Sequence, residues 1–337
     1  MMGDFTPVKI AGVGYSVPET VITNDDLTKL YETSDEWIYT RTGIKERRVV
    51  SGNETAIDLG FDAAKKAIEK AGIDVNDIDC IIGAASAPPQ LYPTLSATIG
   101  AKLGIQDTIP AFDMTAACTG LIYAMQVARG FINANIYKTI LIIAADNNSK
   151  ITDWTDRGTS ILFGDGAGAM VMTASDDGVD DILSIKISAN GAIGDLIKTG
   201  VPSQCCPLVK QADDVASGKI IMNGKDVYKF AVTTVPKYVE ECISLSGLSA
   251  EEIDYLIPHQ ANQRIIEAIQ KRLKYGDEKV ISNIKYYGNT SAASIPIALV
   301  EGVEKGKIKL GSTAVLCGFG AGMTWGGAVI RLREGIC

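Results

Sequence analysis

A cysteine, a histidine and an asparagine follow predicted strands at comparable places in this sequence, and the three side chains suit nucleophilic acyl transfer. Cys118 lies in Met114-Thr-Ala-Ala-Cys-Thr-Gly120, a turn of small residues that leads into an apolar helix. Small neighbours let a substrate approach the backbone closely. The positive end of the helix dipole favours the thiolate form of a thiol placed there. A buried cysteine that fills a tight corner would fit the same pattern.

His259 is the only histidine of the chain, so any imidazole chemistry depends on it. It lies in Pro258-His-Gln-Ala-Asn262, after a predicted strand and before a predicted helix. A lone histidine can also be a surface residue or a satisfied core residue. A zinc site built from several histidines is excluded, and the seven cysteines lack the spacing of a four-cysteine site.

Asn289 lies in Tyr287-Gly-Asn-Thr-Ser-Ala-Ala-Ser-Ile-Pro296, at the second-half counterpart of the Cys118 turn. It could cap the helix that begins near Ser291. Beside a thiol and an imidazole, however, an amide can serve as a hydrogen-bond donor to a developing negative charge.

The elements that must position these residues are strands alternating with helices along the whole chain. Apolar residues recur at helical spacing in some segments, and other apolar runs are typical of strands covered on both faces. The predicted helices are 55–71, 94–103, 120–132, 226–245, 262–274 and 291–304. The predicted strands are 77–86, 110–115, 139–145, 168–174, 252–257, 279–284, 313–318 and 326–332.

Two local matches indicate an internal repeat. The segment from Gly72 to Ile82 parallels the segment from Gly247 to Ile257, an offset of 175 residues, and FGDGAGAMVM at 163–172 parallels FGAGMTWGGAVI at 319–330. We therefore predict an α/β fold of two pseudo-twofold-related halves, 1–175 and 176–337, with layered helices and sheets. Functional residues gather beyond the carboxyl ends of strands in such sheets, so the halves should share a cleft.

Composition narrows the class of protein. With 337 residues, 46% hydrophobic and 21% charged, the chain is neither disordered nor a coiled coil. No apolar run approaches the ~20 residues that span a bilayer, and no signal peptide is visible, so we expect a cytoplasmic protein without membrane attachment. The net charge of −8 argues against broad nucleic-acid binding.

The motifs around these residues resemble those of the β-ketoacyl-acyl carrier protein synthase III family. The resemblance rests on TAACTG at Cys118, PHQAN at His259 and GNTSAASIP at Asn289. Further matches are TSDEWIYTRTG at 33–43, DRGT at 156–159, FGDGAG at 163–168 and GFGAGMTWGG at 318–327. The resemblance runs from about Val8 to Arg333 and implies a duplicated thiolase fold, a homodimer and no cofactor.

The resemblance implies a decarboxylative condensation in the initiation of fatty-acid synthesis. Cys118 would take the acyl group of an acyl-coenzyme A, with an oxyanion hole formed by the backbone N–H groups of Cys118 and Ala321. The family often has glycine at the position of Ala321. Malonyl-acyl carrier protein would then lose carbon dioxide, and neutral His259 and the Asn289 amide would stabilise the resulting enolate.

The resemblance also implies roles for residues around this centre. It assigns coenzyme A binding to Trp37, Arg41, Arg157 and Asn262. The helix after His259 has a basic face that could dock the acidic carrier protein, formed by Arg264, Lys271, Arg272 and Lys274. Tyr92 would close the acyl pocket of the partner subunit and favour short primers such as acetyl. The segment 201–217, with Cys205 and Cys206, is assigned no chemistry.

Parts of the sequence also suggest four other interpretations. A dinucleotide site is rejected, because GDGAG leads into a strand-like segment and no G-x-G-x-x-G is complete. A thiolase or hydroxymethylglutaryl-coenzyme A synthase would use a second cysteine, for which Cys317 is the candidate. A specialised synthase of secondary metabolism stays open. A non-catalytic carrier-binding protein is disfavoured by the intact Cys118, His259 and Asn289.

Overall fold

The computed structural model describes residues 5–105, 108–200, 208 and 218–337. Its main feature is a pair of sheets. The first has five strands in the order β1-β7-β6-β4-β5. These strands are β1 (Val8–Ser16), β4 (Cys80–Ala84), β5 (Ala111–Met114), β6 (Thr139–Asp146) and β7 (Gly166–Ala174).

The second sheet repeats this arrangement with later parts of the chain. Its order is β11-β12-β13-β8, formed by β8 (Ile182–Ala189), β11 (Tyr255–Pro258), β12 (Thr313–Gly320) and β13 (Thr324–Arg331). In both sheets one parallel pair, β4–β6 or β11–β12, is followed by two antiparallel pairs. The duplicated α/β architecture predicted from the sequence is thus present, and the second sheet lacks a counterpart of β5.

The prediction of a strand at 279–284 is wrong. This segment is where the second sheet would have had its counterpart of β5. Val280 makes only an isolated bridge with Leu256. The backbone N–H groups of Asn283 and Ile284 donate instead to the side-chain oxygen of Gln260, at 3.1 and 3.2 Å. A side chain therefore takes the donors that a sheet ladder would have used, and the short helix α10 (Ile284–Tyr287) begins there.

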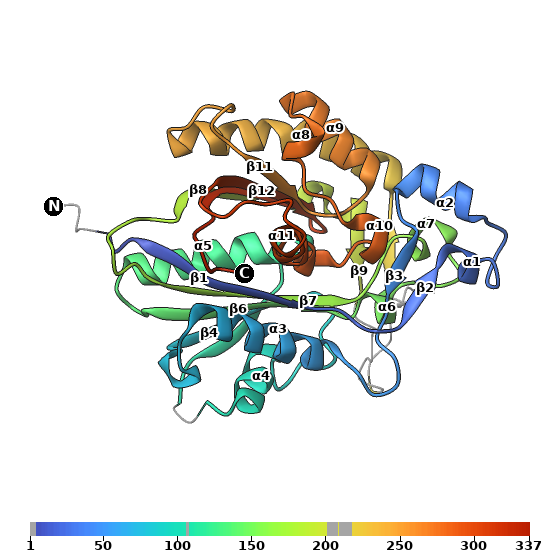
Figure 1. The fold of residues 1–337 in the computed structure, drawn as a ribbon. Helices are drawn as coiled ribbons and strands as arrows, with labels where there is room; N and C mark the ends of the chain where they lie inside the picture. The colour runs from blue at the N-terminus through green and yellow to red at the C-terminus, as the bar shows by residue number, and fades with distance from the viewer. Residues whose placement is uncertain (1–4, 106–107, 201–207, 209–217) are drawn as a thin grey trace.

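Helices lie outside and between the two sheets (Figure 1). The helices α5 (Gly120–Asn133) and α11 (Ser294–Glu304) lie between the sheets. One outer face is covered by α3 (Ala56–Ala71) and α4 (Leu95–Leu103), and the other by α8 (Gly224–Ser246) and α9 (Gln263–Leu273). All six predicted helices are present, with ends that differ by a few residues.

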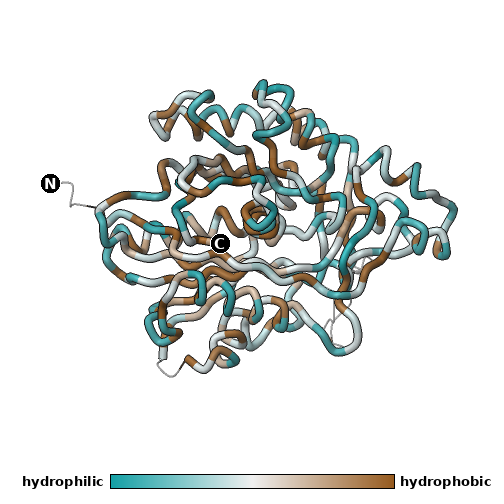
Figure 2. Tube along the Cα trace, viewed as in Figure 1, coloured by the Kyte–Doolittle hydropathy of each residue, from teal (hydrophilic) through white to brown (hydrophobic). Residues whose placement is uncertain are grey.

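The main core explains why the two central helices are almost wholly apolar. Residues of α5, α11 and both sheets form one continuous hydrophobic cluster. Every residue of α11 from Ser294 to Gly302 is buried. Figure 2 shows apolar residues concentrated in these inner strands and helices and polar residues on the outer helices. Burial of apolar area on both sides therefore holds the two sheets at the positions that form the site.

Shorter elements surround one end of this framework, where α2 lies beside α9 (Figure 1). They are β2 (Val21–Thr23), α1 (Asn24–Leu27), α2 (Asp35–Thr42), β3 (Glu46–Arg48), α6 (Asn148–Ile151), α7 (Arg157–Ser160), β9 (Ile197–Thr199) and β10 (Ile220–Met222). Five short 3-10 turns complete the list: Val75–Asp77, Ala117–Thr119, Gly191–Leu196, Asp277–Lys279 and Ser291–Ala293. Among the described residues, no helix combines the length and the hydropathy needed to cross a membrane.

Candidate active site

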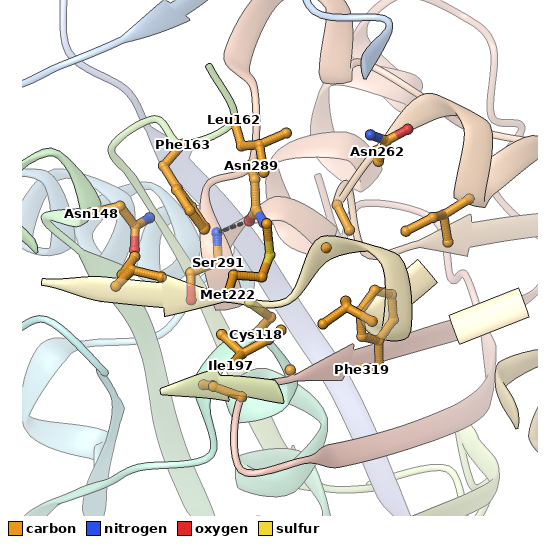
Figure 3. Close-up of a pocket in the computed structure, with 18 of the residues that line it drawn as sticks. Cys118, Asn148, Leu162, Phe163, Ile197, Met222, Asn262, Asn289, Ser291 and Phe319 are labelled. Atoms are coloured by element: carbon orange, nitrogen blue, oxygen red, sulfur yellow. Dashed lines mark hydrogen bonds between the residues drawn. The ribbon is translucent and has the colours of Figure 1, made fainter. Parts of the chain in front are cut away.

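A cavity of about 490 Å³ collects the three residues from which the sequence analysis began. Cys118, His259 and Asn289 all line it. Its walls also include apolar side chains from both halves of the chain, Leu162, Phe163, Ile197, Met222 and Phe319 (Figure 3). The fold therefore brings the thiol, the imidazole and the amide to one largely apolar space.

The Cys118 turn connects β5 to α5 and has a constrained backbone. Residues 117–119 form a 3-10 turn, and Ala117 adopts a left-handed φ of 47°. A non-glycine residue in this region is uncommon and is held there by its surroundings. The equivalent turn of the second half, 291–293, begins with Ser291 at a φ of 53°. The repeat thus places two similarly shaped turns at the cavity.

The end of β12 packs directly against the nucleophile turn. A Cβ atom on Gly320 would lie 2.7 Å from the backbone nitrogen of Cys118, so only glycine allows this approach. The hydroxyl oxygens of Thr119 and Thr324 lie 2.8 Å apart, and both donate to the carbonyl of Ala116. These contacts join the two halves beside Ala321, which lines the cavity.

Burial determines the charge state of the Cys118 thiol. Burial raises the pKa of Cys118 to about 12 and is the largest effect on this pKa. A hydrogen bond with Ser291 lowers the pKa by less, and the negative charge of Asp146 raises it further. The helix dipole was expected to favour the thiolate, but the pKa of Cys118 is raised and not lowered. Loss of water around the sulfur outweighs the favourable terms.

His259 directly follows β11 and is held by backbone and ring contacts. Its N–H donates to the carbonyl of Cys317 at 2.7 Å, and its ring meets the Phe319 ring edge-on with 6.0 Å between centroids. Its Nδ1 lies 2.7 Å from the hydroxyl oxygen of Ser294. Burial lowers the pKa of His259 to about 3, so the imidazole is neutral at physiological pH.

Asn289 is held so that its amide nitrogen faces the cavity. Its backbone N–H donates to Leu162 and its carbonyl accepts from Gly164, at 2.8 and 3.0 Å. Its side-chain oxygen accepts the N–H of Ser291 at 2.9 Å, the dashed line in Figure 3. Because the oxygen is occupied in this way, the NH₂ group is the end left to donate to a ligand. An N-cap role for Asn289 is not found; it precedes the 3-10 turn instead.

The arrangement can stabilise a negative oxygen near a nucleophilic sulfur. A neutral imidazole and a carboxamide nitrogen line the same water-poor space as the thiol, and donors in such a space act on charge as it develops. The described residues hold no cluster of three or more side chains that could bind a metal ion.

The residues expected to bind coenzyme A lie at and around the mouth. Arg41 and Asn262 line the cavity, whereas Trp37 and Arg157 lie outside its wall. The guanidinium carbons of Arg41 and Arg157 lie 4.1 and 4.3 Å from the centre of the Trp37 ring. Asn262 caps α9 and donates to the carbonyl of Arg41 at 3.1 Å. Ser34 caps helix α2, and its side chain accepts the N–H of Trp37.

The basic residues of α9 divide into two groups. Arg264 lines the mouth of the cavity, with its guanidinium 5.9 Å from the ring of Tyr228. Arg272 and Lys274 line a separate groove at the far end of the helix. Lys274 is the C-cap of the helix and has a left-handed φ of 57°. All four cations are exposed.

Two further residues named in the sequence analysis lie outside the cavity wall. Tyr92 is 86% exposed and does not line the cavity of its own chain. Cys317 is buried in β12, and burial raises the pKa of its thiol above the ordinary value. The expectation for Cys205 and Cys206 falls outside the described residues.

Sequence reasoning missed several residues that support the site. Ser294, Ser291, Thr119 and Thr324 contact the proposed catalytic residues or their turns. The only available signal was their position in the repeated turns, because a serine or threonine in a small-residue segment is ordinarily unremarkable. Ser294 lies 35 residues from its partner His259, and Thr119 lies 205 residues from its partner Thr324. Ser291 lies two residues from its partner Asn289.

Family models match both halves of the chain. One described as "3-Oxoacyl-[acyl-carrier-protein (ACP)] synthase III" matches residues 112–191, and one described as the C terminal of that synthase matches residues 243–332. The first range contains Cys118, and the second contains His259 and Asn289.

Individual relatives match over nearly the full length. A protein of Vibrio vulnificus named beta-ketoacyl-[acyl-carrier-protein] synthase III 1 is 47% identical over 323 residues, covering 96% of this chain and 99% of its own. The crystal structure of 3-oxoacyl-[acyl-carrier-protein] synthase III from Aquifex aeolicus has a TM-score of 0.88 and 41% identity, covering 96% and 99%. The priming β-ketosynthase of the R1128 polyketide pathway has a TM-score of 0.90 and 31% identity, covering 99% and 98%.

Proposed function

Because the chain belongs to the 3-oxoacyl-[acyl-carrier-protein] synthase III family, we propose that Cys118, His259 and Asn289 are its catalytic residues. The chain is a condensing acyltransferase with the thiolase fold of that family. The single observation that carries the assignment of residues is their convergence on one cavity from distant parts of the chain.

In the first half-reaction the Cys118 sulfur attacks the thioester carbonyl of an acyl-coenzyme A, acetyl-coenzyme A in the simplest case. A thioester bond forms to Cys118, the bond to coenzyme A breaks, and the thiol proton ends on the coenzyme A sulfur. The tetrahedral oxyanion is stabilised by the backbone N–H groups of Cys118 and Ala321. The close packing of Gly320 against Cys118 supports this pairing, because it brings the two turns together.

In the second half-reaction malonyl-acyl carrier protein loses carbon dioxide and its thioester becomes an enolate. His259 and Asn289 donate hydrogen bonds to the enolate oxygen, and loss of one such donor costs about 2.7–4 kcal/mol in comparable sites. The enolate carbon attacks the acyl-cysteine, and the Cys118 thiolate leaves and takes up a proton. The products are 3-oxoacyl-acyl carrier protein and carbon dioxide, and neither half-reaction needs a cofactor.

The mouth of the cavity supports the same substrates. Arg41 and Arg157 on the Trp37 ring offer positive charge and an aromatic face for the nucleotide of coenzyme A, with Asn262 beside them. Arg264 and Lys271 give the adjoining helix a basic surface on an acidic molecule. An acidic carrier protein would be attracted there, and Arg272 and Lys274 would extend the surface away from the mouth.

A homodimer would complete the site. β5 is an edge strand of its sheet, with Phe112 and Met114 only partly buried, and Leu91 and Tyr92 are exposed in the segment between β4 and α4. An exposed edge with apolar side chains is a ready surface for pairing with a second chain. Tyr92 would then enter the acyl pocket of the partner.

Intact-protein mass spectrometry tests the first step. After incubation with acetyl-coenzyme A, the wild-type chain and Cys317→Ser should each gain one acetyl group, and Cys118→Ser should gain none. Addition of malonyl-acyl carrier protein should remove the adduct and yield 3-oxobutyryl-acyl carrier protein. Absence of an adduct with every acyl-coenzyme A tried would end the enzymatic proposal. A loss in Cys317→Ser equal to that in Cys118→Ser would favour thiolase chemistry.

A second candidate is a priming synthase of secondary metabolism, favoured by the similarity to the R1128 enzyme. It would use the same residues with a different acyl primer. Competition among acyl-coenzyme A donors of increasing chain length, read from the mass of the adduct, distinguishes the two functions.

A further inference from the structure

The hydrogen bonds around Ser294 determine which nitrogen of His259 carries the proton. Ser294 is the first residue of α11 and is 1% exposed. Its hydroxyl oxygen lies 2.7 Å from Nδ1 of His259 and accepts the backbone N–H of Gln260 at 3.3 Å. Both partners belong to the segment that follows β11, so one serine of the central helix contacts the imidazole and its neighbouring peptide.

The Ser294 hydroxyl has one hydrogen, and its two contacts leave one acceptor for that hydrogen. The N–H of Gln260 already points at one lone pair of the oxygen. If Nδ1 carried a proton, that proton would occupy the other lone pair, and the hydroxyl hydrogen would lack an acceptor among the described residues. Leaving a buried donor unpaired is costly. The favoured pattern has Ser294 donating to an unprotonated Nδ1.

The His259 ring is held against a flip that would exchange the positions of Nδ1 and Nε2. The Phe319 ring packs edge-on against the imidazole. Rotating the ring would also break the bond to Ser294. No described residue forms a hydrogen bond with Nε2, and His259 lines the cavity, so Nε2 is the nitrogen left to face a ligand.

We propose that Ser294 is a positioning residue that holds neutral His259 in the tautomer with the proton on Nε2. The consequence for catalysis rests on the proposed function. In this tautomer His259 acts as a hydrogen-bond donor to the enolate oxygen of the malonyl thioester. In this tautomer Nε2 has no free lone pair, so His259 is not the base that removes the Cys118 proton. Ser294 therefore serves condensation and not acylation.

Because His259 is the only histidine, nitrogen NMR of protein labelled with ¹⁵N-histidine reports this one ring. For the full wild-type chain at neutral pH we expect Nδ1 to have the chemical shift of an unprotonated nitrogen and Nε2 that of a protonated one. Ser294→Ala should shift the tautomer equilibrium towards a proton on Nδ1, and Ser294→Thr, which keeps the hydroxyl, should restore the wild-type pattern. A wild-type spectrum with Nδ1 protonated overturns the proposal.

Kinetics provide the second readout. Ser294→Ala should keep the wild-type rate of Cys118 acylation. It should lower the rate of condensation by at least about tenfold, but by less than the ~10²–10³-fold that loss of a whole oxyanion donor causes. Ser282→Ala is the matched control, since Ser282 donates to the Gln260 side chain at 3.1 Å and does not contact His259. Equal loss of both steps in Ser294→Ala, or no loss of either, would contradict the proposal.

The two readouts separate this proposal from the proposed function. If the wild-type chain fails to condense acyl groups, the function is wrong, while the NMR spectrum still tests the role of Ser294. If condensation occurs and the tautomer is the opposite one, only the role of Ser294 is wrong.

Discussion

Cys118 must react although its surroundings hold it in the neutral form. Burial raises the pKa of its thiol to about 12, and burial also keeps His259 uncharged, with a pKa lowered to about 3. A thiolate–imidazolium pair is therefore not the resting state of the site. The pair of neutral groups suits a reaction in which charge appears only on the substrate oxygen, where the donors lie.

The raised pKa of Cys118 predicts how its alkylation depends on pH. The thiolate is the reacting form, so its fraction should grow about tenfold for each pH unit below the pKa. We expect the rate of Cys118 modification by iodoacetamide, followed by peptide mass mapping, to keep rising through pH 9 without a plateau. A plateau below pH 8 would show that the helix dipole outweighs the loss of water around the sulfur.

At the scale of elements, the site depends on how closely β12 approaches the turn before α5. Gly320→Ala would place a methyl group 2.7 Å from the Cys118 nitrogen and force the two turns apart. Because both turns supply proposed oxyanion donors, we expect acylation by acetyl-coenzyme A to fall by about 10²–10³-fold. Stopped acylation reactions analysed by mass spectrometry measure this rate.

The matched control for that substitution is Gly130→Ala in the last turns of α5. A Cβ atom there meets nothing within 4 Å, so the methyl group enters open space. Alanine favours the helix by about 1 kcal/mol over glycine, and we expect a small rise in the free energy of unfolding with unchanged acylation. Equal acylation rates in the Gly320→Ala and Gly130→Ala chains would contradict the proposed oxyanion hole.

Helix α9 offers a second test at this scale, since its cations lie at two ends. Arg264→Glu, at the cavity mouth, should raise the KM for malonyl-acyl carrier protein by about tenfold, because it replaces an attraction with a repulsion. Arg272→Glu makes the same charge change at the distant groove and should have a smaller effect. Steady-state kinetics at low salt measure both, and the difference should shrink at high salt.

A uniform effect of the two α9 substitutions would instead indicate long-range attraction to the whole acidic partner. Acylation by acetyl-coenzyme A, measured for each variant, serves as the control for damage to the cavity that Arg264 lines.

At the scale of the whole molecule, the proposed dimer gives Tyr92 a function that one chain cannot show. Tyr92→Ala should leave the stability of the fold unchanged, because the side chain is 86% exposed. If Tyr92 closes the partner's pocket, the variant should accept longer acyl-coenzyme A donors relative to acetyl-coenzyme A, measured by competition and mass spectrometry. An unchanged preference, or a monomer by light scattering, would remove Tyr92 from the site.

The internal repeat shows how far sequence patterns reach. Strand and helix periodicity predicted the six main helices and most strands, and the 175-residue offset predicted two similar halves. The pattern missed β1, β8 and the short strands β2, β3, β9 and β10, and it wrongly predicted a strand at 279–284. β1 contains Gly12 and Gly14, which weaken its strand signal; added Cβ atoms would lie 2.2 and 2.5 Å from carbonyl oxygens of α3. At 279–284, the side chain of Gln260 takes the donors of the backbone.

The chemistry available to this protein follows from its residues alone: one histidine, a cysteine in a turn of small residues, and an asparagine at the repeated place. Local patterns can indicate such turns because they depend on neighbouring residues. The charge of the thiol and the partner of the imidazole depend on the folded chain, since burial and hydrogen bonds arise between segments that are far apart in the sequence. Ser294, 35 residues from His259, becomes its neighbour only when α11 packs between the two sheets.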